Sequence, residues 1–301
     1  MRRRSRAAYQ RAAVALLAAA LAAVTLAGCA DSDSVHADRT QGPTLPPTTS
    51  AAPTPAPTST LRTGTPSNPL RYAALGDSYS AGMGGGNETG PCRRSPHSFP
   101  QQLAQSKSIV LSRFPACAGA TTADVLQHQI KTLDPQIDLV TITIGGNDLN
   151  VSVLPSACAK GESATCKAAV AASVALLQKL PDKLSKTYKA IAKAAPHARI
   201  LVADYPLFYD LPTIDENTLG SPELSAAVAV DAAVASLDAT ISDAVAKQRQ
   251  AGTDIHFVDV SFKGHGVNAK KPWFVLNGFD AYHPTVNGYT RYADTLSALT
   301  R

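Results

Sequence analysis

Beyond residue 69, the hydrophobic positions of the chain fall into two alternating kinds of segment. Short apolar runs rich in β-branched residues predict five strands: Tyr72–Leu75, Ile109–Ser112, Leu139–Ile144, Ile200–Ala203 and Ile255–Val258. Longer amphipathic or alanine-rich stretches predict helices at Ser98–Gln105, Ala123–Ile130, Thr165–Ala194, Glu223–Gln250 and Val286–Leu299. Pro181 is expected to divide or kink the third helix, because proline lacks a backbone N–H. Strands that alternate with helices predict an α/β domain, with a parallel sheet between two layers of helices.

The first 28 residues have the pattern of an export signal. A basic start precedes the apolar run Ala12–Ala27, and Leu26-Ala27-Gly28-Cys29 follows its core. This tetrapeptide resembles the bacterial lipobox, in which the cysteine is lipidated and becomes the mature N-terminus. Two alternatives remain: Cys29 is incidental beside an ordinary cleavage site, or the run stays in place as a short membrane span. All three interpretations put the rest of the chain outside the cytoplasm.

A segment from residue 29 to residue 68 separates this signal from the predicted domain at 69–301. It is rich in Pro, Thr, Ser and Ala, as in Pro53-Thr54-Pro55-Ala56-Pro57. Such a composition buries too little apolar surface to fold and favours extended conformations. We therefore expect a disordered tether that holds the domain away from the membrane.

The charge distribution argues against a nucleic-acid partner. The formal net charge is +5, but five arginines within the first eleven residues account for all of this excess. The basic and acidic residues that remain are equal in number, and no basic block interleaved with aromatic residues is present. The sequence therefore predicts no surface that follows a phosphate backbone.

The cysteine count fits an oxidising compartment. If Cys29 carries lipid, an even set remains: Cys92, Cys117, Cys158 and Cys166. Four cysteines allow three pairings, and the residues alone leave the choice open.

Small and polar residues follow several of the predicted strands. In open α/β sheets, ligands bind beyond the carboxyl ends of the strands, so these positions are where a site is expected. Three blocks follow strands and a fourth precedes the last helix: Gly76-Asp77-Ser78, Ala116-Cys117-Ala118-Gly119-Ala120-Thr121-Thr122, Gly145-Gly146-Asn147-Asp148 and Phe279-Asp280-Ala281-Tyr282-His283-Pro284. Thr121 or Thr122 is a candidate cap for the helix that follows the second block.

These blocks contain the residue types that serine hydrolysis needs. Ser78 is the candidate nucleophile and His283 the candidate base. Asp280, three residues earlier, is placed to reach the far ring nitrogen of His283 and fix its tautomer, as the acid of a catalytic triad does. Gly119 offers a backbone N–H to a developing oxyanion, and Asn147 offers an uncharged side-chain donor.

Each of these residues also has an ordinary structural interpretation, because Gly, Asp, Asn and Ser all favour turns. For that interpretation to hold throughout, all four blocks would have to contain these residue types by coincidence. The remaining histidines of the domain show no metal-ligand spacing, and a metal site is not predicted. Surface or structural roles are assigned to His36 in the tether and to His97, His128, His197 and His256 in the domain. His265, in a glycine-flanked loop, is assigned a structural or substrate-adjacent role.

The four blocks resemble those of the GDSL, or SGNH, hydrolase family, which is named for Ser, Gly, Asn and His. The corresponding residues here are Ser78, Gly119, Asn147 and His283, and Tyr79 stands where the family name has Leu. Segments similar to the secreted actinobacterial lipase and esterase branch are Ala74-Leu75-Gly76-Asp77-Ser78-Tyr79-Ser80-Ala81-Gly82, Cys117-Ala118-Gly119-Ala120-Thr121-Thr122 and Phe262-Lys263-Gly264-His265-Gly266-Val267.

This resemblance implies a three-layer α/β/α sandwich and an acyl-enzyme mechanism without metal or other cofactor. It implies an oxyanion hole made by the N–H groups of Ser78 and Gly119 and by the Asn147 side chain. It also implies the disulfides Cys92–Cys117 and Cys158–Cys166. Some members orient the histidine with a backbone carbonyl instead of a carboxylate. Relatives often carry a third disulfide after the Gly-His-Gly segment, for which this chain has no spare cysteine.

The sequence therefore predicts a monomeric, lipid-anchored or secreted serine esterase or lipase that acts on acyl esters outside the cytoplasm, with water as the acyl acceptor. A related alternative uses the same site to deacylate cell-envelope glycans or to transfer acyl chains. An alternative of another class is a non-catalytic surface-binding lipoprotein. No long apolar lid segment is present, which favours an open site. The acyl-chain and headgroup preference is not encoded in any motif.

Overall fold

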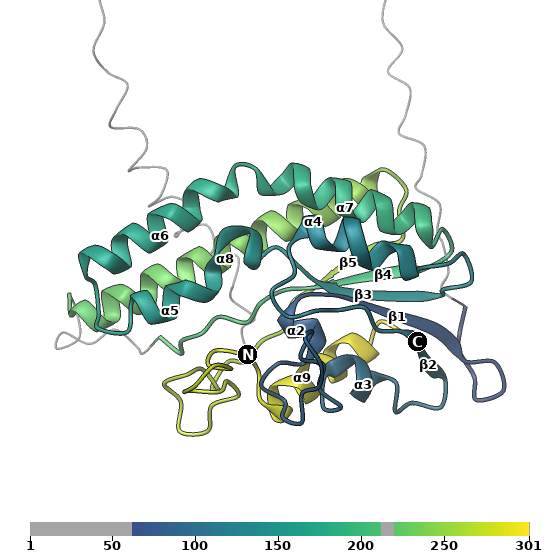
Figure 1. Ribbon diagram of the computed structural model, residues 1–301, viewed down its shortest axis with the longest axis horizontal. Coiled ribbons are helices and arrows are strands. Elements are labelled where there is room, and N and C mark those ends of the chain that lie inside the picture. The colour runs from purple at the N-terminus through teal and green to yellow at the C-terminus, as the bar shows by residue number, and fades with distance from the viewer. Residues whose placement is uncertain (1–61, 212–219, 301) are drawn as a thin grey trace, which may run out of the picture. The chain divides into compact units, whose positions relative to one another are not determined.

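A five-stranded parallel sheet forms the centre of the computed structural model, which describes residues 62–211 and 220–300 (Figure 1). The spatial order of the strands is β2-β1-β3-β4-β5. Their bounds are β1 Leu70–Gly76, β2 Ile109–Arg113, β3 Leu139–Thr143, β4 Arg199–Ala203 and β5 Ile255–Val258. All five predicted strands are thus confirmed. The largest difference is at β1, which begins two residues before Tyr72.

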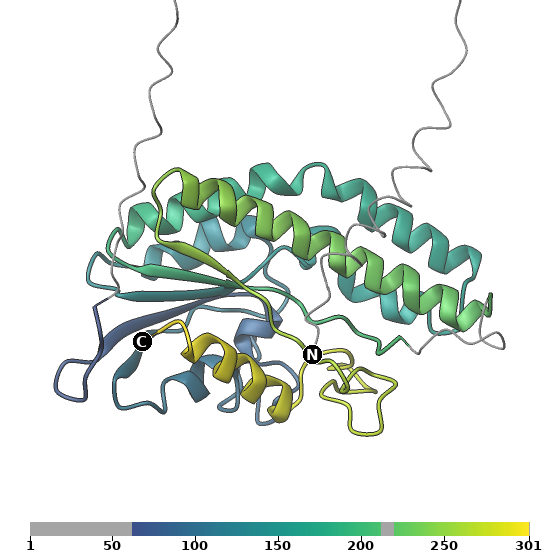
Figure 2. The same ribbon diagram turned by 180° about the vertical axis from the view of Figure 1, so that it is seen from behind.

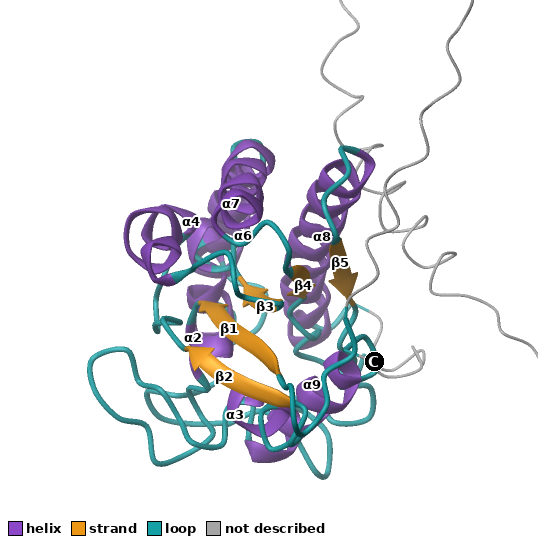
Figure 3. Ribbon diagram, turned by 90° about the vertical axis from the view of Figure 1, so that its right-hand side faces the viewer, coloured by secondary structure: helices purple, strands orange, loops and turns teal. Residues whose placement is uncertain are grey.

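Helices cover both faces of this sheet, so the predicted three-layer α/β/α sandwich is confirmed. One layer holds α6 (Ala164–Leu177), α7 (Leu180–Ala194) and α8 (Pro222–Gln250), with α4 (Thr122–Asp124) beside them. The opposite layer holds α3 (Phe99–Leu103) and α9 (Val286–Ser297). Figure 2 shows α8 running along the outside of its layer, and Figure 3 shows the strands between the two layers.

The single long helix predicted over Thr165–Ala194 is two helices. α6 ends at Leu177 and α7 begins at Leu180, so that Pro181 lies in the first turn of α7. In that position the missing N–H of proline would have had no intrahelical partner, and its fixed φ suits a helix start. The expected division at Pro181 is confirmed.

The core is built by the strands and by one face of each covering helix. All five residues of β3 are buried. α8 is long and apolar enough to span a membrane by length and composition. Its apolar residues at helical spacing are nevertheless buried within the domain: Val230, Val234, Leu237, Ile241 and Val245. This helix is therefore a core element of the sandwich.

The segment after the Gly119 block differs from the single helix predicted over Ala123–Ile130. It consists of α4, a π-helical turn over Val125–Gln129 and a 3₁₀ turn over Ile130–Thr132. The change of helical pitch accompanies a specific contact, because the buried Gln129 amide bonds both the N–H and the C=O of Gly76, each at 2.8 Å. π-turns of this kind are frequent beside functional sites.

Arg62, the first residue that the structure describes, contacts the predicted domain. Its guanidinium bonds both carboxylate oxygens of Asp138, at 3.1 and 2.8 Å, and also the backbone carbonyls of Asn68 and Pro69. This residue belongs to the segment at 29–68 that is predicted as a tether. The predicted signal at 1–28, Cys29 and residues 30–61 of the tether lie outside the described residues.

Candidate active site

The strand order places the carboxyl ends of β1 and β3 side by side, at the point where the chain's crossovers change direction. β2 lies on one side of β1 and β3 on the other, and ligands of open α/β sheets bind at such a switch point. The Gly76-Asp77-Ser78 block leaves β1 here, and the block containing Asn147 leaves β3. Two of the predicted site blocks are therefore neighbours because of the topology.

Ser78 starts a four-residue helix, α2 (Ser78–Ala81), which the sequence pattern did not predict. The chain passes from strand to helix through Gly76, whose φ is 121°. A Cβ at this position would lie 2.4 Å from the carbonyl oxygen of Thr143, so a residue with a side chain does not fit. The sharp turn presents Ser78 at the top of the sheet.

Asp77 supports this turn from below. Its buried carboxylate accepts hydrogen bonds from the N–H of Tyr79 at 3.0 Å, from the Thr143 hydroxyl at 2.8 Å and from the Tyr205 hydroxyl. Burial raises the pKa of Asp77 to about 6. Asp77 therefore caps α2 and is part of the scaffold under Ser78.

Ser78 and His283 are in direct contact across 205 residues of sequence. The Nε2 of His283 lies 2.8 Å from the Oγ of Ser78. The Nδ1 of the same ring lies 3.2 Å from the backbone carbonyl of Asp280, which can only accept. Nδ1 therefore carries the proton, and Nε2 is free to accept the hydroxyl proton of Ser78. Burial lowers the pKa of His283, which favours the neutral imidazole that a general base needs.

The atom of Asp280 that contacts His283 differs from the predicted one. Its backbone carbonyl, not its carboxylate, faces the imidazole. The carboxylate instead accepts two hydrogen bonds from Nη2 of Arg93, at 2.7 and 2.9 Å. A guanidinium binds a carboxylate more strongly than a neutral imidazole does, and this accounts for the direction of the side chain. The site thus holds a Ser–His pair with a main-chain acceptor behind it.

Gly119 and Asn147, the other two predicted donors, both lie in turns at the carboxyl edge of the sheet. Gly119 has a φ of 79°, and no atom lies within 4 Å of where its Cβ would be. Glycine is favoured here because of the left-handed backbone conformation, and not because a side chain would clash with a neighbour. Asn147 starts a 3₁₀ turn, and its Nδ2 donates to the carbonyl of Ala120 at 3.0 Å. An amide nitrogen carries two protons, so one remains for a substrate oxygen.

Asp148 ties these two turns together. Its carboxylate accepts from the N–H of Thr122 at 2.8 Å and from the Thr122 hydroxyl at 2.7 Å, and Nζ of Lys183 binds it at 3.0 Å. Thr121 caps α4, one of the two possibilities left open, through a capping box with Asp124. The Gly119 turn is thereby fixed to the Asn147 turn by a buried acid.

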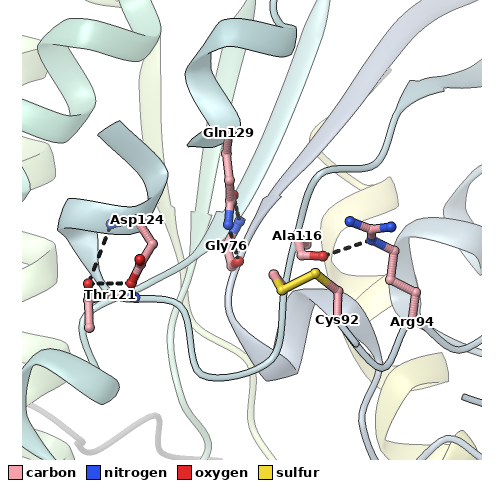
Figure 4. Close-up of a disulfide and its surroundings, with 8 residues drawn as sticks. Gly76, Cys92, Arg94, Ala116, Thr121, Asp124 and Gln129 are labelled. Atoms are coloured by element: carbon pink, nitrogen blue, oxygen red, sulfur yellow. Dashed lines mark hydrogen bonds between the residues drawn. A yellow bond between two sulfur atoms is a disulfide. The ribbon is translucent and has the colours of Figure 1, made fainter. Parts of the chain in front are cut away.

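The structure contains both disulfides that the family resemblance implies, Cys92–Cys117 and Cys158–Cys166. The first joins the loop after α2 to the Gly119 turn, and Figure 4 shows it beside Gly76. The carbonyl of Cys92 also accepts from the N–H of Ala118 at 3.1 Å. The second disulfide joins the end of α5 (Leu154–Ala157) to α6, and Cys158 lines a cavity together with Tyr282.

Removing the first disulfide is expected to lower both stability and turnover. It spans 25 residues, and a closed loop of this size contributes about 3.5 kcal/mol to the free energy of unfolding. The double variant Cys92→Ser/Cys117→Ser should also lose kcat, because the Gly119 turn loses its covalent support. The comparison variant is Cys158→Ser/Cys166→Ser, which opens an 8-residue span and should cost about 2.5 kcal/mol. Because it leaves the Gly119 turn tethered through Cys92–Cys117, its kcat should fall less. Urea unfolding and ester hydrolysis measure the two effects; equal kcat values in both variants would contradict the assignment.

A second expectation concerns pH. Because burial lowers the pKa of His283, kcat/KM should rise with pH along an acidic limb centred below the ordinary histidine value of 6.5 and be constant at neutral pH. The profile of kcat/KM between about pH 4 and pH 8 tests this, since it reports ionisations of the free enzyme. A limb centred above 6.5 would be incompatible with a desolvated base.

The other described histidines do not contact Ser78 or His283. His265 stacks on Trp273 with ring centroids 3.7 Å apart and contacts the carbonyl of Lys271, so its role is structural. His256 pairs with Asp254 at 2.6 Å. Within residues 62–211 and 220–300, no three His, Cys, Asp or Glu side chains converge as metal ligands would.

Two residues that shape the site were not predicted. Gln129 holds Gly76, and Arg93 holds Asp280. The sequence contains one weak indication of Gln129, which is a polar residue on the inward face of an amphipathic stretch. It contains no indication of Arg93, because the partner of Arg93, Asp280, lies 187 positions away.

The α/β/α sandwich, with a Ser–His contact at its switch point, has the architecture of hydrolases of the α/β class. A family model described as the GDSL-like lipase/acylhydrolase family matches residues 74–291. A lipase from Streptomyces rimosus is 38% identical over 238 residues, which cover 76% of this chain and 86% of the relative. Lipase 1 from Streptomyces coelicolor is 36% identical over 227 residues, covering 72% and 81% of the two chains.

Solved structures agree with these relatives. The crystal structure of an extracellular lipase from S. rimosus matches with a TM-score of 0.68 and 34% identity, over 76% of this chain and 99% of that one. A phospholipase A1 from Streptomyces albidoflavus matches with a TM-score of 0.67 and 32% identity, over the same shares. The chain belongs to the GDSL-like lipase/acylhydrolase family, and it is an enzyme that hydrolyses acyl esters. The family resemblance drawn from the sequence is confirmed.

Proposed function

We propose that Ser78 and His283 carry out this hydrolysis through an acyl-enzyme. The Oγ of Ser78 adds to the ester carbonyl carbon while Nε2 of His283 takes its proton. The resulting oxyanion accepts hydrogen bonds from the N–H groups of Ser78 and Gly119 and from the Asn147 amide. Collapse of this intermediate breaks the bond to the alcohol, which leaves with the proton from His283. Water, deprotonated by the same imidazole, then cleaves the acyl-serine bond.

The single observation that carries this proposal is the 2.8 Å contact between Ser78 Oγ and His283 Nε2. The carbonyl of Asp280 supports it by selecting the tautomer in which Nε2 is the acceptor. Among the described residues, no acceptor is bonded to the N–H of Ser78 or of Gly119, so both donors are available to an oxyanion.

For the substrate, we propose carboxylic esters of lipids, with phospholipid esters included. A lipase and a phospholipase A1 are among the relatives that this chain resembles over three quarters of its length. Two cavities border the site residues. One of about 460 Å³ is lined by the Gly119 turn, and one of about 360 Å³ is lined by Tyr282, the residue before His283. Both fall in the size range of small-molecule sites.

A substrate panel tests this part of the proposal. The full-length enzyme should hydrolyse p-nitrophenyl esters of short and medium acyl chains, triacylglycerols and diacyl phospholipids. Acetylated glycans serve as the comparison substrate of a different class. Hydrolysis of the acetylated glycans together with inactivity on every lipid ester would overturn the assignment of lipid esters while leaving the serine mechanism in place.

We further propose that the mature protein is a monomer anchored through lipid on Cys29, after removal of residues 1–28 as a lipoprotein signal. One relative, the S. rimosus lipase, is extracellular, and an export signal agrees with that location. The proposal is supported by the order of basic residues, apolar run and Leu26-Ala27-Gly28-Cys29. In this arrangement the Pro-, Thr- and Ser-rich tether at 29–68 follows the anchor, and the domain at 69–301 follows the tether.

Metabolic labelling with palmitate tests the anchor. The wild-type precursor should incorporate label and sediment with membranes, whereas Cys29→Ala should be unlabelled and soluble. Equal labelling of the two proteins would reject the lipobox.

A further inference from the structure

His283 is carried by a hairpin that depends on its own backbone pairing. The N–H of Val275 donates to the carbonyl of His283, and the N–H of Tyr282 donates to the carbonyl of Val275, each at 2.8 Å. Tyr282 has a φ of 66°, an uncommon value for a residue with a side chain. The tip of this hairpin is solvent-facing, because Phe279 is 79% exposed. Its conformation therefore needs support from outside the hairpin.

Arg93 supplies contacts from a second loop. The N–H of Arg94 and the N–H of Thr89 each bond the other residue's carbonyl, which closes a tight turn, and Arg93 sits in this turn with a φ of 51°. The preceding residue is Cys92, whose disulfide partner Cys117 lies two positions before Gly119. Arg93 is thus one peptide bond from the covalent link to the Gly119 turn.

The Arg93 side chain lies against the hairpin at two points. Its Nη2 binds both oxygens of the Asp280 carboxylate, and its guanidinium lies 5.1 Å from the centre of the Phe279 ring. On its other side, Glu88 is 3.9 Å away, and the Glu88 carboxylate accepts from the N–H of Gly84 at 2.8 Å. A Cβ at Gly84 would come within 3.1 Å of the His283 Cβ, so this glycine packs on the back of the histidine.

We propose that Arg93 is a positioning residue for the reaction proposed above, on which this inference rests. By holding the carboxylate of Asp280, Arg93 fixes the carbonyl of the same residue against Nδ1 of His283. Because Arg93 follows Cys92, it also keeps the base in register with the Gly119 turn. The Arg93 side chain thereby links three segments: the hairpin that carries His283, the Gly119 turn and the loop that contains Gly84.

The charges around His283 give this role a distinctive signature. The charges of Asp280 and Arg93 act on the imidazole, the Tyr79 ring lies 5.4 Å from it, and the Glu88 carboxylate binds Gly84 behind it. Arg93 lowers the pKa of His283 and Asp280 raises it, so the two charges of the ion pair act in opposite directions. Removing either partner leaves the other charge uncompensated beside the imidazole.

The test compares Arg93→Gln, Arg93→Lys, Asp280→Asn and the double variant Arg93→Gln/Asp280→Asn in the full-length enzyme. Arg93→Gln should lower kcat by about 10- to 100-fold with little change in KM, since a displaced base costs turnover rather than binding. The acidic limb of kcat/KM should move to higher pH in Arg93→Gln and to lower pH in Asp280→Asn. In the double variant the limb should return toward the wild-type position while kcat stays low.

Arg93→Lys separates charge from geometry. Lysine keeps the positive charge but not the planar guanidinium, so the limb should stay near its wild-type position while kcat falls. This variant and Asp280→Asn keep the proposal testable if Arg93→Gln does not fold.

Arg71→Gln is the matched control. Arg71 binds both oxygens of Asp134, and its side chain is 36% exposed against 33% for Arg93. It lies at the start of β1, at the edge of the sheet opposite to the site. Its kcat and acidic limb should match the wild type. Unchanged kcat and an unmoved limb in a folded Arg93→Gln protein would overturn the positioning role. Failure of the serine mechanism itself would be recognised separately, as an absence of fluorophosphonate labelling in the wild type.

Discussion

Replacing Ser78 with alanine is expected to lower kcat/KM for p-nitrophenyl butyrate by about 10⁴-fold or more, because no acyl-enzyme can form without the nucleophile. The folded structure should persist. The Oγ of Ser78 bonds only His283 among the described side chains, and loss of such a hydrogen bond costs about 1 kcal/mol of stability. A thermal-melting curve close to that of the wild type, together with lost activity, is therefore the expected pair of results.

The control for this substitution is Ser106→Ala. Ser106 is an exposed serine whose hydroxyl pairs with Ser108 in the turn before β2, away from the site. It should keep wild-type activity. Wild-type activity in Ser78→Ala would remove the serine mechanism, whatever the result for the control.

The second large effect is expected at Asn147. Asn147→Ala should lower kcat by about 10²- to 10³-fold, the usual cost of removing one oxyanion donor. Asn147→Asp should do at least as much harm, because a carboxylate cannot donate and repels the developing negative charge. KM should change little in both variants, since the hydrogen bond to the oxyanion forms only in the transition state.

Asn147 also holds the Ala120 carbonyl, so a loss of activity needs a structural control. Melting curves report any loosening of the Gly119 turn, and Asn287→Ala, an exposed position of α9, shows the effect of removing an amide elsewhere. An increase in KM with unchanged kcat in Asn147→Ala would assign this residue to substrate binding instead of oxyanion stabilisation.

The strands and the long helices could be predicted because each buries a continuous apolar face. β3 is buried at every position and shows as an unbroken apolar run, and α8 shows as a long apolar stretch between Pro222 and Gln250. α2 could not be predicted, because four residues contain no helical period. The π-turn over Val125–Gln129 was also missed, since its pitch is accompanied by a contact with Gly76 that lies 53 positions away.

The site blocks were visible because parallel strands end at one edge, so residues after different strands meet there. The three-residue separation of Asp280 and His283 predicted that both lie in the same turn. It does not determine which oxygen of Asp280 faces the ring. That choice depends on Arg93, whose interaction with Asp280 exists only in the folded chain. The correction at Asp280 and the missed role of Arg93 therefore have one cause.

The proposed mechanism requires that Ser78, activated by His283, forms a covalent bond to the acyl carbon of the substrate. Treatment with a fluorophosphonate probe followed by mass spectrometry tests this requirement, because the probe bonds to a serine that is already activated. We expect one adduct per chain, mapped to the peptide that contains Ser78, absent in Ser78→Ala and formed much more slowly in His283→Ala. An adduct at another residue that persists in Ser78→Ala would rule out Ser78 as the nucleophile.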